Sequence, residues 1–172
     1  NRILDECEKE LGWMYETNHM NEDGKQIYDM TGLVKGKISD VIWSEVFICP
    51  NCGKETVFWD VAVDKEKRKI KKIFECNNCG VKLKKTDCRK AIELIRDDRL
   101  NRTINMAKQE PVLINYIVGR KRFNKKPDKE DLETIEKINN MEISYWYPID
   151  ELPDGYNTEQ PKKSHGITHR SE

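Results

Sequence analysis

The stretch that decides the fold is Cys49-Pro-Asn-Cys52-Gly, followed after 23 residues by Cys76-Asn-Asn-Cys79-Gly. Each motif is a C-x-x-C turn that places two thiolates on one side of a metal ion, and a second such turn closes the other side. Glycine after each second cysteine permits a tight turn that directs backbone N–H groups at the sulfur atoms. The motifs predict a structural zinc site with four protein ligands and no position open for catalysis: Cys49, Cys52, Cys76 and Cys79.

Two other uses of paired cysteines fit this chain poorly. A pair of disulfides is typical of secreted proteins, but the chain has no signal peptide and no secretory cysteine framework. A redox C-x-x-C motif would occur once, beside a βαβ pattern. The other two cysteines, Cys7 and Cys88, have no partner at short spacing and are expected to be reduced thiols. Reduced thiols and a zinc site together predict a cytoplasmic protein.

The residues between the two motifs predict a β-hairpin. Two sets of side chains alternate from Val57 to Asp64, which indicates a strand with two unlike faces. A charged turn over 64–67 and a second apolar run, Ile70 to Phe74, complete the hairpin. Two knuckles joined by a hairpin describe a zinc ribbon, a fold too small to be stable without its metal. We therefore expect an α+β protein whose zinc ribbon, residues 46–85, is rooted in a small mixed α/β body.

The remaining residues are expected to form that body and a tail. Segments 1–45 and 86–150 make up the body, and 151–172 form an extended polar tail that leaves the body after the aromatic residues 145–147 have packed. No stretch approaches the ~20 apolar residues of a membrane-spanning helix. Before and after the ribbon, residue periodicity predicts a helix over 3–11, strands over 13–17 and 41–48, and a helix over 86–96 capped by Thr86. Pro111 predicts a break, followed by a buried strand over 112–118 and a return strand over 120–123. The last predicted helix is capped by Asp128, and its core stripe is Leu132, Ile135, Ile138 and Met141.

Charges are segregated along a chain with equal numbers, 31 each, of basic and acidic residues. Residues 1–30 carry a net charge of −5, and residues 65–90 carry +8. A basic strip matches a nucleic-acid backbone, but an exposed charge run is equally typical of a solvated face. Arginine pairs bidentately with guanine, so base reading would favour Arg68, Arg120 or Arg122. The candidate DNA contacts are Lys65, Lys67, Arg68, Lys69, Lys71 and Lys72 on the ribbon, and Arg120, Lys121 and Arg122 on the second hairpin.

Motifs that would support catalysis are missing from the sequence. The nine glycines never form a G-x-G, so there is no glycine-rich nucleotide loop, and no P-loop occurs. No Ser–His–Asp arrangement stands out, and the carboxylates lie on charged faces where solvation explains them. We expect the chain to catalyse no reaction by itself.

Five short motifs occur in order along the chain: Gly12-Trp-Met-Tyr-Glu-Thr17, Trp43-Ser-Glu-Val-Phe-Ile-Cys-Pro-Asn-Cys52, Phe58-Trp-Asp-Val-Ala-Val-Asp64, Pro111-Val-Leu-Ile-Asn-Tyr116 and Gly166-Ile-Thr-His169. Together they resemble the central region of a group of bacterial and archaeal DNA methyltransferases that methylate adenine N6 or cytosine N4. The resemblance covers about Gly12 to His169 and so nearly the whole chain.

The resemblance implies a role in DNA recognition within a larger enzyme of the kind found in restriction–modification systems. In that family, a D/N/S-P-P-Y/F/W motif carries catalysis and an F-x-G-x-G motif binds S-adenosylmethionine. This chain has neither, since none of its six prolines are adjacent. Together with an Asn at position 1, this predicts a piece cut from a longer protein. The piece would be an inactive zinc-ribbon insert, whose partners are double-stranded DNA and the methylating core of the same parent chain.

A second interpretation gives the ribbon no nucleic-acid role. It would then brace the enzyme or dock a protein partner, with Trp59 and the aromatic residues 145–147 as anchors, because aromatic side chains dominate such interfaces. The same aromatics could equally belong to the core.

Overall fold

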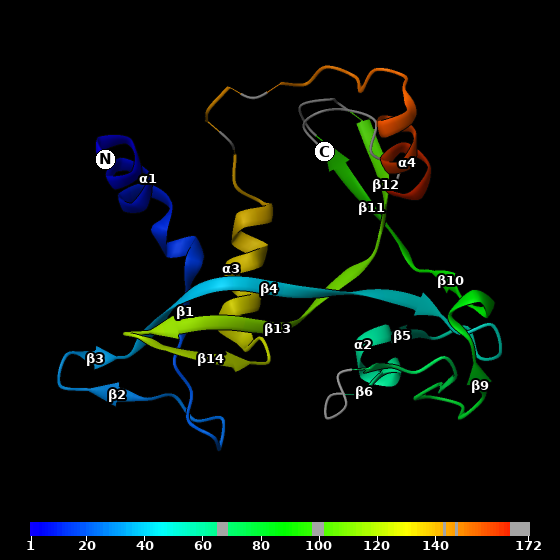
Figure 1. The fold of residues 1–172 in the computed structure, drawn as a ribbon, viewed down its shortest axis with the longest axis horizontal. Coiled ribbons are helices and arrows are strands. Elements are labelled where there is room, and N and C mark those ends of the chain that lie inside the picture. The colour runs from blue at the N-terminus through cyan, green and yellow to red at the C-terminus, as the bar shows by residue number, and fades with distance from the viewer. Residues whose placement is uncertain (65–68, 98–101, 143, 147, 166–172) are drawn as a thin grey trace. The chain divides into compact units, whose positions relative to one another are not determined.

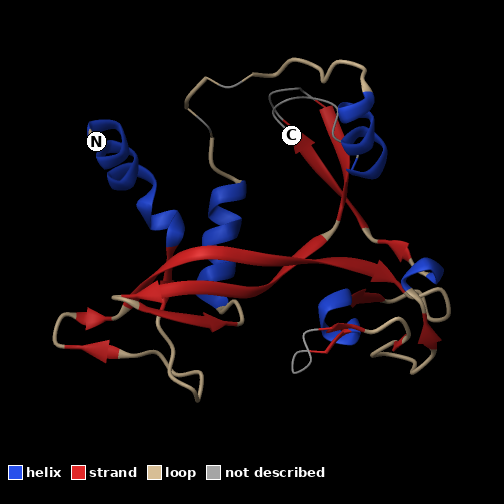
Figure 2. Cartoon of the chain, viewed as in Figure 1, coloured by secondary structure: helices blue, strands red, loops and turns tan. Residues whose placement is uncertain are grey.

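The computed structural model describes residues 1–64, 69–97, 102–142, 144–146 and 148–165. The chain forms two compact units: residues 1–43 with 111–142, and residues 44–110 with 143–172. Each unit combines helices with antiparallel hairpins, as Figures 1 and 2 show, and the expected α+β class is confirmed. The units divide the chain differently from the four expected segments, because residues 86–110 group with the ribbon rather than with the body.

The first unit is built on a sheet in which β1, β4, β13 and β14 are neighbours in that order. The pairs β1–β4 and β13–β14 are antiparallel, with Thr17 opposite Gly36 and Tyr116 opposite Phe123. The elements are α1 (Arg2–Leu11), the 3-10 turn η1 (Gly12–Tyr15), β1 (Glu16–Asn18), β2 (Tyr28–Asp29), β3 (Gly32–Leu33), the first part of β4 (Lys35–Ile48), most of β13 (Gln109–Val118), β14 (Lys121–Lys125) and α3 (Lys129–Asn139).

The most apolar run of the sequence forms the centre of this sheet. Ile114 and Tyr116 on β13 are almost completely buried, which confirms the predicted buried strand and its return strand. Gly36 on β4 makes room for Tyr116, because a Cβ atom on Gly36 would lie 2.3 Å from Cδ2 of the ring. A contact that short requires a residue without a side chain at position 36.

Helix α3 begins at the predicted cap. Asp128 Oδ1 accepts a hydrogen bond from the Asp131 N–H at 3.0 Å, and Asp131 Oδ2 accepts one from the Asp128 N–H at 2.8 Å. This reciprocal capping box satisfies two N–H groups at the helix start. The predicted core stripe is only half correct: Ile135 and Ile138 are half-buried, whereas Leu132 is 48% exposed and Met141 lies beyond the end of the helix.

The second unit contains the cysteine motifs and several two-stranded hairpins. The strand pairs β6–β7, β8–β9 and β11–β12 are antiparallel, and β5 and β10 both pair with β4. The elements after β4 are β5 (Glu55–Val57), α2 (Phe58–Ala62), β6 (Val63–Asp64), β7 (Lys69–Ile70), β8 (Phe74–Glu75), β9 (Lys82–Leu83), the 3-10 turn η2 (Lys85–Asp87), β10 (Arg89–Lys90), β11 (Ile92–Asp97), β12 (Arg102–Ala107) and α4 (Tyr156–His165).

The predicted strand over residues 57–64 is wrong at its centre. A short helix, α2, replaces it, although Val63 and Asp64 do pair with Ile70 and Lys69 as the hairpin requires. The hydroxyl of Ser44 on β4 accepts a hydrogen bond from the Trp59 N–H at 2.9 Å and so satisfies one free donor at the helix start. A contact between residues 15 positions apart therefore overrides the local alternation.

The predicted helix over residues 86–96 is also wrong. Residues 92–97 form β11, in which Ile92 lies opposite Ala107, and Thr86 lies in the 3-10 turn η2. Ala91 links the start of this hairpin to β4, because its N–H donates to the Val46 carbonyl and its carbonyl accepts a hydrogen bond from the Lys108 N–H. Pro111 lies inside β13 instead of breaking the chain; its fixed φ suits an extended strand, in which it removes only one donor.

Two smaller predictions also need correction. The strand expected over 13–17 begins only at Glu16, because residues 12–15 form η1, where the ring of Trp13 lies 3.9 Å from Lys137 Nζ on α3. Of the aromatic residues expected to pack, Tyr145 and Trp146 are instead exposed, Trp146 by 87%, and Tyr147 lies outside the described residues. The tail expected to be extended contains α4, and Lys162 on this helix forms an ion pair at 2.8 Å with Asp154, which precedes the helix.

Candidate metal centre

The two cysteine motifs fold into turns with the same hydrogen-bond pattern. In the first, the Cys49 N–H donates to the Lys54 carbonyl and the Gly53 N–H to the Cys49 carbonyl, both at 2.9 Å. In the second, Cys76 and Gly80 make the equivalent bonds, at 3.0 and 2.9 Å. Gly53 and Gly80 have φ angles of +70° and +69°, a left-handed conformation that favours glycine. The repeated C-x-x-C-G sequence therefore encodes two matching knuckles.

The knuckles bring the four sulfur atoms together. All four lie within 4.8 Å of one another, and the distances Cys49 Sγ–Cys79 Sγ and Cys52 Sγ–Cys76 Sγ are both 3.8 Å. With zinc–sulfur bonds of about 2.3 Å, the edges of a regular sulfur tetrahedron are about 3.8 Å long. The four cysteines are thus positioned to bind a metal ion, as the sequence predicted.

The local electrostatics favour thiolates at part of the cluster. Backbone N–H groups of the second knuckle, chiefly that of Asn78, point at the Cys76 sulfur and lower the pKa of that thiol to about 6. The N–H of Lys54 acts in the same way on Cys52, whose pKa is also lowered. At Cys49, an N–H group of its own knuckle favours the thiolate, but burial and the neighbouring sulfurs outweigh it and raise the pKa to about 11. A bound cation would offset the repulsion between these neighbouring thiolates and hold its thiol ligands deprotonated.

A small apolar cluster surrounds the sulfurs. The Phe58 ring of α2 meets the rings of Phe47 and Phe74 edge to face, with centroids 5.5 and 5.6 Å apart. Cys88 packs against the cluster without joining the four sulfurs, and Cys7 is exposed in the other unit. The buried members of the cluster are Cys49, Val61, Ala62, Phe74, Cys76 and Leu83.

The predicted DNA contacts fall into three groups. Lys65, Lys67 and Arg68 lie outside the described residues. Lys69 on β7 and the following Lys71 and Lys72 are exposed. The cations of the second hairpin lie at the β13–β14 turn and along β14.

Arg120, Lys121 and Arg122 are all exposed and sit at the β13–β14 turn or on β14. In the part of the chain that the structure describes, none of the three forms an ion pair. By contrast Lys125, four residues after Lys121, is buried and bonded to Asp128 at 2.5 Å and to Asp131 at 2.8 Å. The basic segment 119–126 therefore has an outward part and a structural part, which the sequence does not distinguish.

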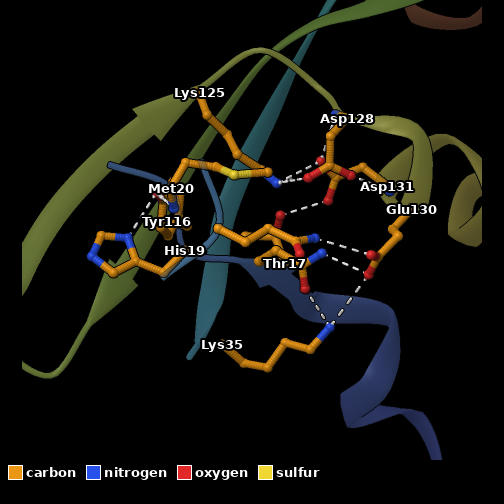
Figure 3. Close-up of polar contacts among 11 residues, drawn as sticks. Thr17, His19, Met20, Lys35, Tyr116, Lys125, Asp128, Glu130 and Asp131 are labelled. Atoms are coloured by element: carbon orange, nitrogen blue, oxygen red, sulfur yellow. Dashed lines mark hydrogen bonds and ion pairs between the residues drawn. The ribbon is translucent and has the colours of Figure 1, made fainter. Parts of the chain in front are cut away.

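A polar network surrounds Lys125 that no motif in the sequence indicates (Figure 3). Thr17 Oγ1 donates to Asp131 Oδ1 at 2.5 Å, and Asn18 Nδ2 donates to Glu130 Oε2 at 2.6 Å, so β1 is tied to the start of α3. Lys35 Nζ donates in turn to Asn18 Oδ1 at 2.5 Å. In two of these bonds the partners are more than 100 positions apart along the chain, so the network depends on the tertiary fold of the unit.

Comparison with protein-family models finds none that matches the chain. Neither the curated proteins nor the solved structures contain a match. Among the described residues, no helix is both long and apolar enough to cross a membrane. The geometry of the site shows a four-cysteine cluster positioned to bind a metal ion within an α+β fold.

Proposed function

We propose that the chain is a non-catalytic zinc-ribbon region of an amino-methylating DNA methyltransferase and that it holds DNA for the methylating core. The observation that carries the proposal is the closed set of four cysteines in the second unit. The first unit adds a hairpin whose exposed cations Arg120, Lys121 and Arg122 form no ion pair in the described structure. The motifs from Gly12 to His169 supply the link to the methyltransferases, for which S-adenosylmethionine would bind elsewhere in the parent chain.

Zinc is the metal that best fits the four ligands. Four thiolates in a tetrahedron are typical of structural zinc, and the sulfur–sulfur distances of 3.8 Å agree with its bond lengths. Because the protein fills every position, no site remains where a water molecule or substrate could be activated. The metal would therefore stabilise the ribbon, and the reduced thiolates are consistent with a cytoplasmic protein.

The role in DNA binding rests on charge and chemistry. An enzyme that modifies an exocyclic amino group must extrude the target base, so other parts of the protein have to hold the flanking duplex. Arg120 and Lys121 at an exposed turn can contact phosphates without breaking any ion pair of the described structure. Lys69, Lys71 and Lys72 form a second exposed basic segment on the ribbon.

The test is a fluorescence-anisotropy titration of the zinc-loaded 172-residue chain against a 20-base-pair duplex at several salt concentrations. We expect log K to fall linearly with log salt, by about 0.9 per phosphate contact. Changing Arg120, Lys121 and Arg122 together to Gln should reduce this slope by about 1.8 to 2.7. Loss of Arg120 and Lys121 removes about 0.9 each, and loss of Arg122 adds about 0.9 more only where that side chain contacts a phosphate.

The matched control neutralises three exposed cations of the acidic N-terminal segment, as Arg2→Gln, Lys9→Gln and Lys25→Gln. This variant loses the same charge from a different part of the first unit and should keep the slope of the parent. Equal losses in the two variants would indicate a general charge effect, and absence of binding at low salt would overturn the DNA role.

An interaction module without a nucleic-acid role is the second candidate, and one observation favours it. Several large apolar side chains are exposed in the second unit, among them Leu94 on β11 and Trp146 and Tyr156 near the C-terminus. Exposed aromatics mark protein interfaces. A Trp146→Ala variant that retains DNA binding but no longer associates with the methylating core would assign these side chains to a protein interface.

A further inference from the structure

A half-polar hollow lies on the sheet of the first unit, where β4, β13 and β14 run side by side. Its volume is about 390 Å³. Side chains from all three strands line it: Asp40 from β4, Asn115 from β13, and Arg122 and Asn124 from β14. Of these four residues only Arg122 is among the DNA contacts predicted from the sequence, and none belongs to the zinc site.

The strand register shows which face of the hairpin carries these side chains. Asn115 lies opposite Asn124, and Ile117 lies opposite Arg122, so these residues share one face of β13–β14. The alternate pairs, such as Ile114 opposite Lys125, belong to the other face, where Lys125 reaches the start of α3. Arg122 and Asn124 are therefore directed away from the face that α3 covers.

The mixture of chemical groups in the hollow argues against a phosphate ligand there. Asp40 is exposed, and its carboxylate accepts a hydrogen bond from Asn115 Nδ2 at 2.7 Å, so a negative charge lies beside the two β14 side chains. A phosphate would be repelled by that carboxylate. The edge of a base instead offers both donors and acceptors, and can bond to an arginine, an amide and a carboxylate at once.

The position of the cations fits a duplex with its backbone at the turn and its bases at the hollow. Arg120 and Lys121 lie at the hairpin turn, whereas Arg122 and Asn124 follow at alternate positions along β14. The major groove of DNA admits a two-stranded β-ribbon, and some DNA-binding proteins read bases with strands placed there. Side chains two residues apart on a strand share one face, so Arg122 and Asn124 can both be directed at base edges.

We propose that this face of β13–β14 reads base edges of duplex DNA, with Arg122 directed at guanine and Asn124 at adenine. The inference rests on the proposed function and adds to it a distinction between residues that position the duplex and residues that read its sequence.

The experiment selects bound duplexes from a pool with randomised central base pairs, using the zinc-loaded 172-residue chain. We expect enrichment of sites that contain guanine and adenine at fixed positions. Arg122→Lys keeps the charge but loses the planar fork, so it should reduce the preference for guanine by about 5- to 150-fold while the salt slope stays unchanged. Asn124→Ala should relax the adenine position by a similar factor.

Two controls match these variants. Arg120→Lys makes the same chemical change at the turn and should leave the sequence preference unaltered, because lysine also contacts phosphates. Asn105→Ala removes an exposed amide from β12 in the other unit and should change neither preference nor affinity. The melting temperature and zinc content of each variant show that it is folded.

The outcomes separate this inference from the proposed function. Salt-dependent binding by the parent chain without any enriched sequence would overturn base reading and leave the DNA-holding role intact. An unchanged preference in both Arg122→Lys and Asn124→Ala would also overturn it. Absence of salt-dependent binding would overturn both proposals.

Discussion

The two units of the molecule achieve stability by different means. In the second unit, six buried residues form the apolar cluster of the ribbon, and two of these are themselves candidate metal ligands. In the first unit, a buried strand packs beneath α3, and a network around Lys125 closes the structure without any metal ligand. The ribbon should therefore depend on an ion, and the first unit on the completeness of its buried polar contacts.

The two units show two ways in which a small apolar core can be supplemented, by a metal site in the ribbon and by a buried ion network in the first unit. Fewer than about 40 residues rarely bury enough apolar surface to fold alone, so a ribbon of that size needs a metal or another crosslink. A buried ion network has the opposite risk, because removing one partner leaves an uncompensated charge. Separate perturbations of the two units can test this contrast.

The largest effect should follow loss of the metal. Structural zinc in finger peptides contributes about 10–16 kcal/mol of apparent binding free energy, so Cys76→Ser or Cys49→Ser should unfold at least residues 46–82. Hydrogen exchange should show loss of protection there, while β13, β14 and α3 stay protected. Cys7→Ser is the control, because Cys7 is exposed and far along the chain from the motifs. If both ligand variants retain zinc and melt like the parent, the ligand assignment is wrong.

The next largest effect should come from Lys125→Met in the first unit. This change leaves Asp128 and the buried Asp131 without their cation and should destabilise the unit by about 3–5 kcal/mol. Urea denaturation monitored by hydrogen exchange in α3 measures the loss, and zinc content should remain unchanged. Lys126→Met alters the exposed neighbour and should stay within about 0.5 kcal/mol of the parent. Similar losses in the two variants would mean that the buried network contributes little.

A smaller effect is expected from Gly36→Ala. The new methyl group would lie 2.3 Å from the Tyr116 ring, and overpacking of a tight core costs about 1–3 kcal/mol. Gly12→Ala provides the comparison, since its nearest atoms, those of Glu8, lie at an ordinary 3.5 Å. The free energy of unfolding, measured by urea denaturation, should fall only for the first variant. A Gly36→Ala protein as stable as its parent would show that the sheet relaxes around Tyr116.

The smallest effect should be a dependence of the first unit on pH. Burial alone would raise the pKa of Asp128, but hydrogen bonds from Lys125 and from the Asp131 N–H outweigh it and hold the pKa below its ordinary value of 3.8. A depressed pKa stabilises the fold above the unfolded-state value, and this contribution is lost as pH falls through the folded-state value. The parent should therefore lose melting temperature below about pH 4.

Asp128→Asn isolates this contribution, because asparagine also caps helices but does not ionise in this range. The difference in melting temperature between parent and variant should be largest near pH 7 and shrink toward pH 3. A difference that stays constant over this range would mean that the Asp128 charge does not contribute.

The cysteine knuckles and the cap of α3 could be predicted from sequence because their determinants are local. Each knuckle is closed by hydrogen bonds within six residues, and the capping box joins Asp128 to a residue three positions away. The buried run of β13 was equally evident, since its apolar side chains are consecutive. In such segments, the physics that fixes the backbone is contained in a short stretch of sequence.

The remaining features depend on contacts between distant residues. The hydrogen bond to Ser44 stabilises helix α2 in a segment whose side chains alternate like those of a strand, and β11 forms because residues 102–107 pair with it. Lys125 differs from the exposed cations of its segment because it is buried in ion pairs with Asp128 and Asp131. The sequence by itself determined the metal ligands, the α+β class and the position of the capped helix. Only the tertiary structure decided which cations are buried, which alternating segment is a strand and which polar side chains share an open face. The reason is that burial and strand pairing depend on partners that local periodicity does not identify.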